Sequence, residues 1–230
     1  MMLSVIIPCY NEVKCLPLIL EKVRNVKLKE GIKKEIILID DFSTDGTREK
    51  IKKINFPGLK KVFHPKNMGK GAAVKSGIAA SSGELIIIQD ADLEYDPKDY
   101  NNLISPIIEK KALVVYGSRF LGSKTKHSHF SFWIGGIMVT LTTNLLYFSS
   151  LTDEPTCYKT FKADVLKKIN IEGDRFDWEP EITAKILKKG IKIAEVPISY
   201  YPRTKKEGKK INWRDGIDAI WTLVYWRFKD

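Results

Sequence analysis

The stretch LIIIQDADLE, residues 85–94, sets the architecture that we predict for this chain. Its apolar start is typical of a strand buried on both faces, and we predict such a strand over Glu84–Gln89. Ligands of an open parallel sheet bind beyond the carboxyl ends of its strands. The polar residues that follow this strand are therefore candidates for a binding site.

Asp90 and Asp92 stand two residues apart at the end of this strand. In an extended chain such residues project to the same side and offer two carboxylates to one ion. Mg²⁺ or Mn²⁺ suits these ligands, because proteins hold such ions through one or two carboxylates that substrate phosphates and water complete. An ordinary acidic turn, with Asp92 capping the next helix, is the alternative.

The rest of the first 120 residues alternates strands and helices. The apolar runs predict strands over Leu3–Ile7, Glu35–Ile39 and Lys61–His64, mostly buried on both faces, and the helical spacing predicts helices over Leu16–Val26, Thr47–Ile54 and Lys70–Ala80. This alternation predicts an α/β fold with a doubly wound parallel sheet and right-handed crossovers.

The second half is less regular but carries no repeat and no low-complexity linker. We predict a helix from Pro97, strands over Leu113–Tyr116, Thr156–Phe161 and Lys192–Val196, and helices over Ser131–Ser149 and Glu179–Lys189. We expect this half to complete a single domain spanning residues 1–230, with any internal boundary near Leu121.

Composition narrows the possible partners and the compartment. The 230 residues carry a formal net charge of +11, which favours acidic partners such as nucleic acid, an anionic membrane surface or phosphate-bearing small molecules. A nucleic-acid-binding module rests on charge alone, since the basic residues are dispersed and match no recognition motif. Cys9, Cys15 and Cys157 form no CxxC pair, and we expect a reducing, cytoplasmic compartment.

Two segments bear on membrane contact. Residues 128–152 contain no charged side chain and are long enough to cross a bilayer of about 30 Å, but glycine, threonine and serine dilute their apolarity, so we expect a buried or surface-lying helix. The N-terminus lacks the pattern of a secretory signal. At the C-terminus, one helical stripe joins Trp213, Ile217, Ile220, Trp221, Val224, Tyr225 and Phe228. That amphipathic helix either lies at a membrane interface or closes the core.

Polar residues also follow the other strands. Pro8, Tyr10 and Glu12 come after the first, and Asp40 with Asp41 after the second. NMGKGAAVKSG, residues 67–77, allows close backbone approach to phosphate but lacks P-loop spacing, and we interpret Asn67 as a helix cap. Arg119, after the fifth strand, suits a phosphate or a carboxylate, unless it forms a surface salt bridge. His127 and His129 lack further ligands for a zinc site.

Taken together, VIIPCYNE, LIDDFSTDGT, NMGKGAAVKSG, LIIIQDADLE and VYGSRF resemble, in this order, the family 2 inverting glycosyltransferases of GT-A fold. The dolichyl- and polyprenyl-phosphate mannose or glucose synthases are the most similar. The resemblance implies a Rossmann-like, mostly parallel sheet with helices on both faces. It also implies a nucleotide-sugar-binding half (residues 1–120) and an acceptor-binding half (residues 121–230) with an interfacial C-terminal helix.

The resemblance further implies residue roles. Pro8, Tyr10, Glu12 and Asp40 would hold the nucleoside, and Asp90 and Asp92 the metal and the donor pyrophosphate. Arg119 and Arg203 would meet the lipid phosphate and donor phosphates, assisted by Lys209 and Lys210. The catalytic set would be Asp92, Arg119, Asp153 and Arg203. Three positions depart from the family: Glu94 replaces a glutamine, Cys157 replaces a glycine, and HSHFSFW replaces a basic helix start, leaving only Lys126 and His129 there.

These roles imply transfer of a hexose from a nucleotide sugar, of GDP-mannose or UDP-glucose type, to a polyprenyl or dolichyl phosphate. A phosphate acceptor is already ionised at neutral pH and needs holding rather than deprotonation. We expect peripheral attachment to the cytoplasmic face of a membrane or attachment through a membrane-spanning partner subunit, and no nucleic acid. The alternatives are a saccharide or protein hydroxyl acceptor, with Asp153 as base, and a nucleotidylyltransferase, for which the expected glycine- and arginine-rich loop is absent.

Overall fold

The sheet follows from the buried apolar strands and is mostly parallel, as predicted. The computed structural model describes residues 1–29, 31–122, 130–203 and 213–229. Its seven-stranded sheet has the order β3-β2-β1-β4-β6-β5-β7, and β6 runs antiparallel to both neighbours. The strands are β1 (Met2–Cys9), β2 (Lys33–Asp40), β3 (Leu59–Phe63), β4 (Leu85–Ile88), β5 (Val114–Ser118), β6 (Lys159–Lys162) and β7 (Ile193–Pro197).

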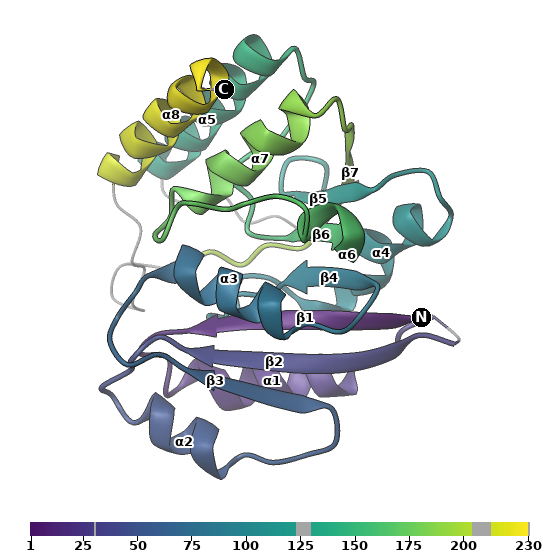
Figure 1. Ribbon diagram of the computed structural model, residues 1–230, viewed down its shortest axis with the longest axis vertical. Coiled ribbons are helices and arrows are strands. Elements are labelled where there is room, and N and C mark those ends of the chain that lie inside the picture. The colour runs from purple at the N-terminus through teal and green to yellow at the C-terminus, as the bar shows by residue number, and fades with distance from the viewer. Residues whose placement is uncertain (30, 123–129, 204–212, 230) are drawn as a thin grey trace.

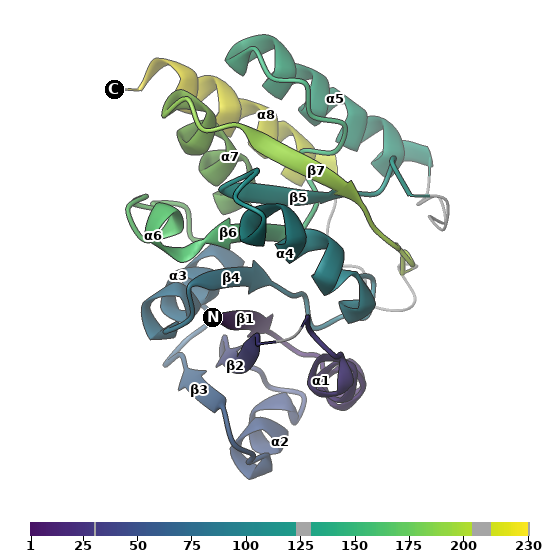
Figure 2. The same ribbon diagram turned by 90° about the vertical axis from the view of Figure 1, so that its right-hand side faces the viewer.

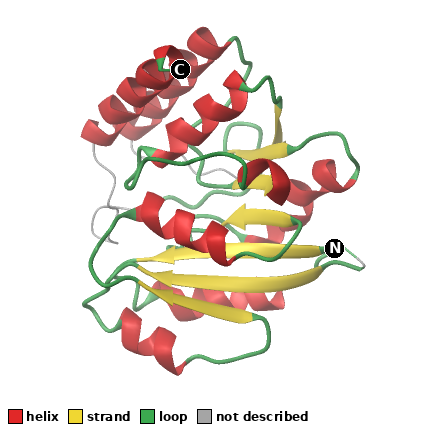
Figure 3. Cartoon of the chain, in the orientation of Figure 1, coloured by secondary structure: helices red, strands yellow, loops and turns green. Residues whose placement is uncertain are grey.

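Helices cover both faces of this sheet (Figure 1). They are α1 (Cys15–Asn25), α2 (Thr47–Lys53), α3 (Lys70–Ala80), the 3-10 turn η1 (Pro97–Asp99), α4 (Tyr100–Ile108), α5 (Phe130–Tyr147), α6 (Ala163–Leu166), α7 (Trp178–Lys188) and α8 (Trp213–Phe228). The apolar residues of α1 and α4 pack on one face, and those of α3 and α7 on the other (Figure 2). The helices α5 and α8 form an outer layer against α7 (Figure 3).

Alternation along β1 explains this two-faced core. Leu3, Val5 and Ile7 point to the α1 side, whereas Ile6 points to the α3 side. Successive side chains of a strand point to opposite faces, so an apolar run must be covered twice. On the α3 side, Gly77 lies so close to Ile6 that a Cβ there would collide with it. The absence of a side chain at Gly77 therefore lets α3 lie close to β1.

The order of the predicted elements is confirmed, with boundaries that differ by at most three residues, and the short helix α6 was not predicted. Two details differ. The edge strands β3 and β7 are only partly buried, because each has a neighbour on one side alone. The strand β6 enters antiparallel between β4 and β5, a pairing that its apolar pattern does not encode. Within the described ranges, no helix is long and apolar enough to cross a membrane.

The interpretation of Asn67 as a helix cap is wrong. The residue preceding α3 is Gly69, and no side chain caps this helix. Instead, the backbone N–H groups of Gly71 and Ala72 donate to the carbonyls of Arg175 and Asp174. The start of α3 is thus capped by a loop from more than a hundred residues away, which satisfies the orphan N–H groups that a helix start exposes.

Candidate functional site

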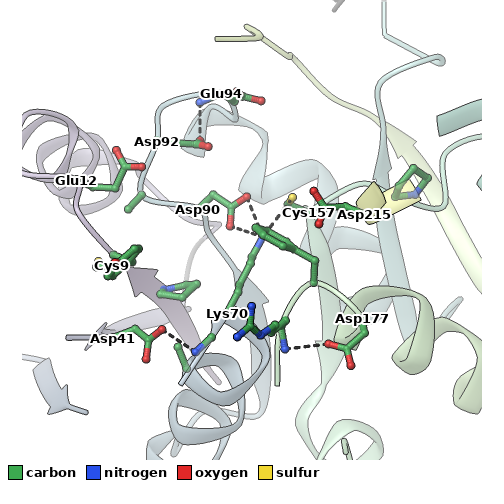
Figure 4. Close-up of a pocket in the computed structure, with 18 of the residues that line it drawn as sticks. Cys9, Glu12, Asp41, Lys70, Asp90, Asp92, Glu94, Cys157, Asp177 and Asp215 are labelled. Atoms are coloured by element: carbon green, nitrogen blue, oxygen red, sulfur yellow. Dashed lines mark hydrogen bonds and ion pairs between the residues drawn. The ribbon is translucent and has the colours of Figure 1, made fainter. Parts of the chain in front are cut away.

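A cavity of about 770 Å³ opens at the carboxyl ends of β1, β2, β4 and β5. The strand order reverses between β1 and β4, which is the position where α/β sheets bind ligands. Its walls include Pro8, Tyr10 and Glu12 after β1 and both carboxylates of the predicted metal pair after β4. Figure 4 shows these acidic side chains around the cavity together with Lys70 from α3.

Asp90 is held by Lys70, a residue that the sequence did not single out. The Lys70 ammonium lies 2.8 Å from Asp90 Oδ1 and 2.9 Å from Glu179 Oε1, and Figure 4 shows it reaching toward Asp90 and Cys157. Burial alone would raise the pKa of Asp90. The charge of Lys70 and hydrogen bonds from Cys157 and Lys70 outweigh burial, so the pKa is lowered. Lys70 and Cys157 therefore favour the ionised carboxylate of Asp90.

Asp92, the second carboxylate of the predicted metal pair, is held by a different cation, Arg203. Arg203 Nη2 lies 2.8 Å from Asp92 Oδ2, and Nη1 lies 3.2 Å from Glu12 Oε2. Burial, followed by the charges of Asp90 and Glu94, raises the pKa of Asp92 to about 7. This site therefore concentrates more negative charge than its two local cations neutralise.

The two carboxylates fit a divalent cation that substrate phosphates would complete. In the part of the chain that the structure describes, no group of three or more His, Cys, Asp or Glu side chains could hold a metal ion. A pair of carboxylates is nevertheless the usual protein contribution to Mg²⁺ bound with phosphates, where water fills the remaining positions. The donor set is oxygen from Asp90 and Asp92, which suits Mg²⁺ and Mn²⁺.

Arg119 and Asp153, two predicted catalytic residues, pair with each other. Arg119 Nε and Nη2 each donate to Asp153 at 2.7 Å, and the Arg119 backbone N–H donates at 2.8 Å. Arg119 lines the cavity, whereas Asp153 has an exposed fraction of 0% and does not line it. Asp153 thus positions Arg119 and does not present a base to the cavity.

The predicted nucleoside residues divide into two groups. Pro8, Tyr10 and Glu12 line the cavity, but Asp40 does not. Asp40 is buried and accepts from Arg48 Nε at 2.5 Å. Its neighbour Asp41 lines the cavity instead.

Asp41 is held by three donors that come together only in the fold. His64 Nδ1 lies 2.8 Å from Asp41 Oδ1, and the backbone N–H groups of Met68 and Gly69 each donate to the carboxylate at 2.8 Å. His64 Nε2 in turn lies 2.9 Å from Ser76 Oγ. His64 is the last residue of the third predicted strand. This position at a strand end could have indicated from the sequence that His64 contacts a residue of the site.

Several further wall residues escaped the sequence analysis. These are Lys70, the loop residues Arg175, Phe176 and Asp177, and Asp215, Asp218 and Thr222 of α8. Trp221, which was predicted only as part of the apolar stripe of α8, also lines the cavity. Only Lys70 lay within a recognised motif. Lys209 and Lys210 lie outside the described residues, as do Lys126, His127 and His129. Glu94 lines the cavity and accepts from Tyr200 Oη at 2.6 Å.

Comparisons with known proteins bear on what this site does. The family model for Glycosyl transferase family 2 matches residues 4–169. The chain is 31% identical over 211 residues to a dolichyl-phosphate beta-glucosyltransferase of Trichomonas vaginalis, covering 86% of this chain and 65% of that protein. It is 33% identical over 245 residues to the dolichyl-phosphate beta-glucosyltransferase of Dictyostelium discoideum, covering 99% of this chain and 74% of that one.

A solved structure supports the fold. Glucosyl-3-phosphoglycerate synthase from Mycobacterium tuberculosis, in complex with Mn²⁺, uridine diphosphate and glucosyl-3-phosphoglycerate, matches with a TM-score of 0.74. The match covers 98% of this chain and 79% of that one at 18% sequence identity. A likeness at this identity establishes that the two proteins share the GT-A type of sheet and helix arrangement. It assigns no role to individual residues.

Proposed function

This chain belongs to glycosyl transferase family 2, and from that membership we propose that it moves a hexose from a nucleotide sugar to a polyprenyl or dolichyl phosphate at a membrane surface. The observation that carries the proposal is the Asp90 and Asp92 pair at the cavity beyond β4. Its relatives from Trichomonas and Dictyostelium are named for glucose, which favours glucose over mannose as the hexose.

The first 120 residues hold the donor in this proposal. Pro8, Tyr10, Glu12 and Asp41 surround the nucleoside, with Asp41 replacing the predicted Asp40. Asp90 and Asp92 hold Mg²⁺ or Mn²⁺. When bound, such an ion neutralises charge that develops on the leaving diphosphate. The neighbour from Mycobacterium tuberculosis was crystallised with Mn²⁺ and uridine diphosphate, which supports this type of donor.

In this proposal the acceptor-binding half, residues 121–230, contributes Arg203 together with Lys209 and Lys210. Arg119 contacts this half through its ion pair with Asp153. In an inverting displacement, an acceptor phosphate oxygen bonds to the anomeric carbon while the bond to the donor phosphate breaks. An ionised phosphate needs no proton removed. The commitment of buried Asp153 to Arg119 argues against its use as a base for a hydroxyl acceptor.

The outer faces of α5 and α8 support action at a membrane surface. Exposed apolar side chains run along α5 and just past its end, at Ile134, Met138, Leu141, Leu145 and Phe148, and along α8, at Ile217, Trp221, Tyr225 and Phe228. Phe148 is 85% exposed and Trp221 is 68% exposed. Interfacial helices bury such stripes at the headgroup boundary.

The inner face of α8 packs Leu223 and Trp226 in the core, which is one of the two roles considered from its sequence, and its exposed outer face supports the other. We propose peripheral attachment to the cytoplasmic face, or attachment there through a membrane-spanning partner subunit. None of the three cysteines forms a disulfide, which agrees with a reducing compartment.

Incubation of the purified chain with polyprenyl phosphate vesicles and radiolabelled UDP-glucose or GDP-mannose tests the proposal. We expect Mn²⁺- or Mg²⁺-dependent label in the lipid fraction and none after chelation. Wild-type protein and the Asp90→Asn variant would be run in parallel. Transfer only to saccharides or peptides, or unchanged transfer by the variant, would refute the assignment.

A further inference from the structure

Arg175 stands where two cavities meet. It lines the main cavity and also an adjoining cavity of about 470 Å³, and both cavities share Asp177 of its own loop and Trp221 of α8. Neither a sequence motif nor a role discussed above accounts for this arginine. Its position between the carboxylate pair and the outer helices makes it a candidate for contact with the acceptor.

The other cations of the main cavity are already neutralised. Lys70 pairs with Asp90 and Glu179, Arg119 with Asp153, and Arg203 with Asp92 and Glu12. The Arg175 guanidinium, by contrast, makes no hydrogen bond or ion pair with any residue in the described ranges, although its backbone does. An anion could bind Arg175 without first displacing a carboxylate.

The backbone that carries Arg175 is firmly placed. Its carbonyl accepts from Gly71 N at 3.1 Å, and its N–H donates to Asp177 Oδ1 at 2.8 Å. Further along the loop, Gly173 N donates to Glu181 Oε2 at 2.7 Å. A Cβ at Gly69 or Gly71 would collide with this loop, so α3 and the loop fit closely. An ordered backbone lowers the entropic cost of binding through the side chain.

We infer that Arg175 binds the phosphate of the acceptor, an inference that rests on the proposed function. A guanidinium matches the geometry of a phosphate through two parallel N–H···O bonds. The donor diphosphate belongs near Asp90 and Asp92, whereas Arg175 adjoins Trp221 and Thr222 of α8, the helix whose outer stripe would face lipid. The carboxylates of Asp177, Asp215 and Asp218 line the same side and disfavour a phosphate elsewhere on that wall.

The test compares wild type with Arg175→Ala, Arg175→Lys and a charge-matched control, Lys189→Ala, at the exposed end of α7. Two quantities are measured: the KM for polyprenyl phosphate during transfer, and the dissociation constant for UDP or GDP with Mn²⁺ by calorimetry. Removing a charge-assisted hydrogen-bonded pair predicts a 10- to 100-fold higher acceptor KM in Arg175→Ala, as an order-of-magnitude range. Lysine restores part of this loss, and the control changes neither quantity.

Direct binding separates this inference from the proposed function. Short-chain polyprenyl phosphate in detergent is titrated into each variant in the presence of the nucleoside diphosphate. We expect wild type and Lys189→Ala to bind and Arg175→Ala to bind at least about tenfold more weakly. The thermal midpoint of Arg175→Ala should stay unchanged, because the guanidinium makes no hydrogen bond or ion pair within the described residues. Weakened nucleotide binding with an unchanged acceptor KM would assign Arg175 to the donor and overturn the inference.

The two failures then differ in their results. Wild type that binds the lipid phosphate through Arg175 but transfers no sugar to it would sink the proposed function and retain the inference. Wild type that transfers sugar to the lipid with an acceptor KM equal to that of Arg175→Ala would retain the function and sink the inference. Wild type that neither binds nor uses the lipid phosphate would overturn both.

Discussion

Replacing Asp153 with Asn tests whether this carboxylate holds Arg119 in place. The substitution keeps the side-chain shape but removes the charge. It also replaces one carboxylate oxygen, which accepts a hydrogen bond from Arg119, with an NH₂ group that cannot accept one. Three hydrogen bonds from Arg119, at 2.7 to 2.8 Å, meet the Asp153 carboxylate. Asp153 is fully buried, so water cannot replace the lost acceptor.

The magnitude follows from that burial. Breaking a buried ion pair by removing one partner costs about 3–5 kcal/mol, because an uncompensated charge remains. Arg119 is 19% exposed at its side chain and opens to the cavity, which relieves part of this penalty. We therefore expect Asp153→Asn to lower the free energy of unfolding by about 2–4 kcal/mol. For a domain of this size the midpoint of thermal unfolding would fall by roughly 4–16 °C.

Urea unfolding at neutral pH measures the change, with Asp164→Asn as the matched control. Asp164 pairs with Lys162 at 2.9 Å, but it is 56% exposed, so its loss should cost less than about 1 kcal/mol. Asp153→Asn should also lose sugar transfer while nucleoside diphosphate binding persists, because Arg119 loses its fixed orientation. If both variants unfold at the same urea concentration, or if Asp153→Asn transfers sugar normally, the positioning role is refuted.

Three further predictions concern other parts of the chain. Asp92→Ala should remove most transferase activity with the fold retained, since Arg203 keeps Glu12 as a partner; near-normal turnover would contradict the metal assignment. Gly71→Ala should lower the free energy of unfolding by about 1–3 kcal/mol, because its Cβ would collide with the loop before α7. Gly135→Ala lies in open space within α5 and should raise the free energy of unfolding by about 0.5–1 kcal/mol. Denaturant midpoints that do not separate in this order would count against the close fit of α3 and the loop. Glu35→Gln should cost about 1–3 kcal/mol near neutral pH: burial would raise the pKa of Glu35, but hydrogen bonds from Ser4, Lys60 and Ser82 lower it to about 2. Because this pKa is depressed in the folded state, the stabilisation should be complete above about pH 5 and shrink toward pH 2, and a difference that stays constant over this range would be contrary to the hydrogen-bond account.

Local patterns were enough for the sheet and for one part of the site. The apolar runs before Cys9, Asp40 and Asp90 identified β1, β2 and β4, because a strand buried on both faces must be apolar at nearly every position. The carboxyl ends of parallel strands share one edge, so the residues after those runs had to meet there. Asp90 and Asp92 were identified for this reason, and the structure places both in the cavity wall.

Long-range packing decided which charges meet. Asp40 turns inward because it pairs with Arg48 of α2. Asp41 faces the cavity, where the loop before α3 donates to its carboxylate. That Arg175 reaches the cavity depends on carbonyls of its loop capping α3. The ion pair of Asp92 with Arg203 and the capping of α3 each join residues about a hundred positions apart, and the periodicity of a single segment carries no information about such partners.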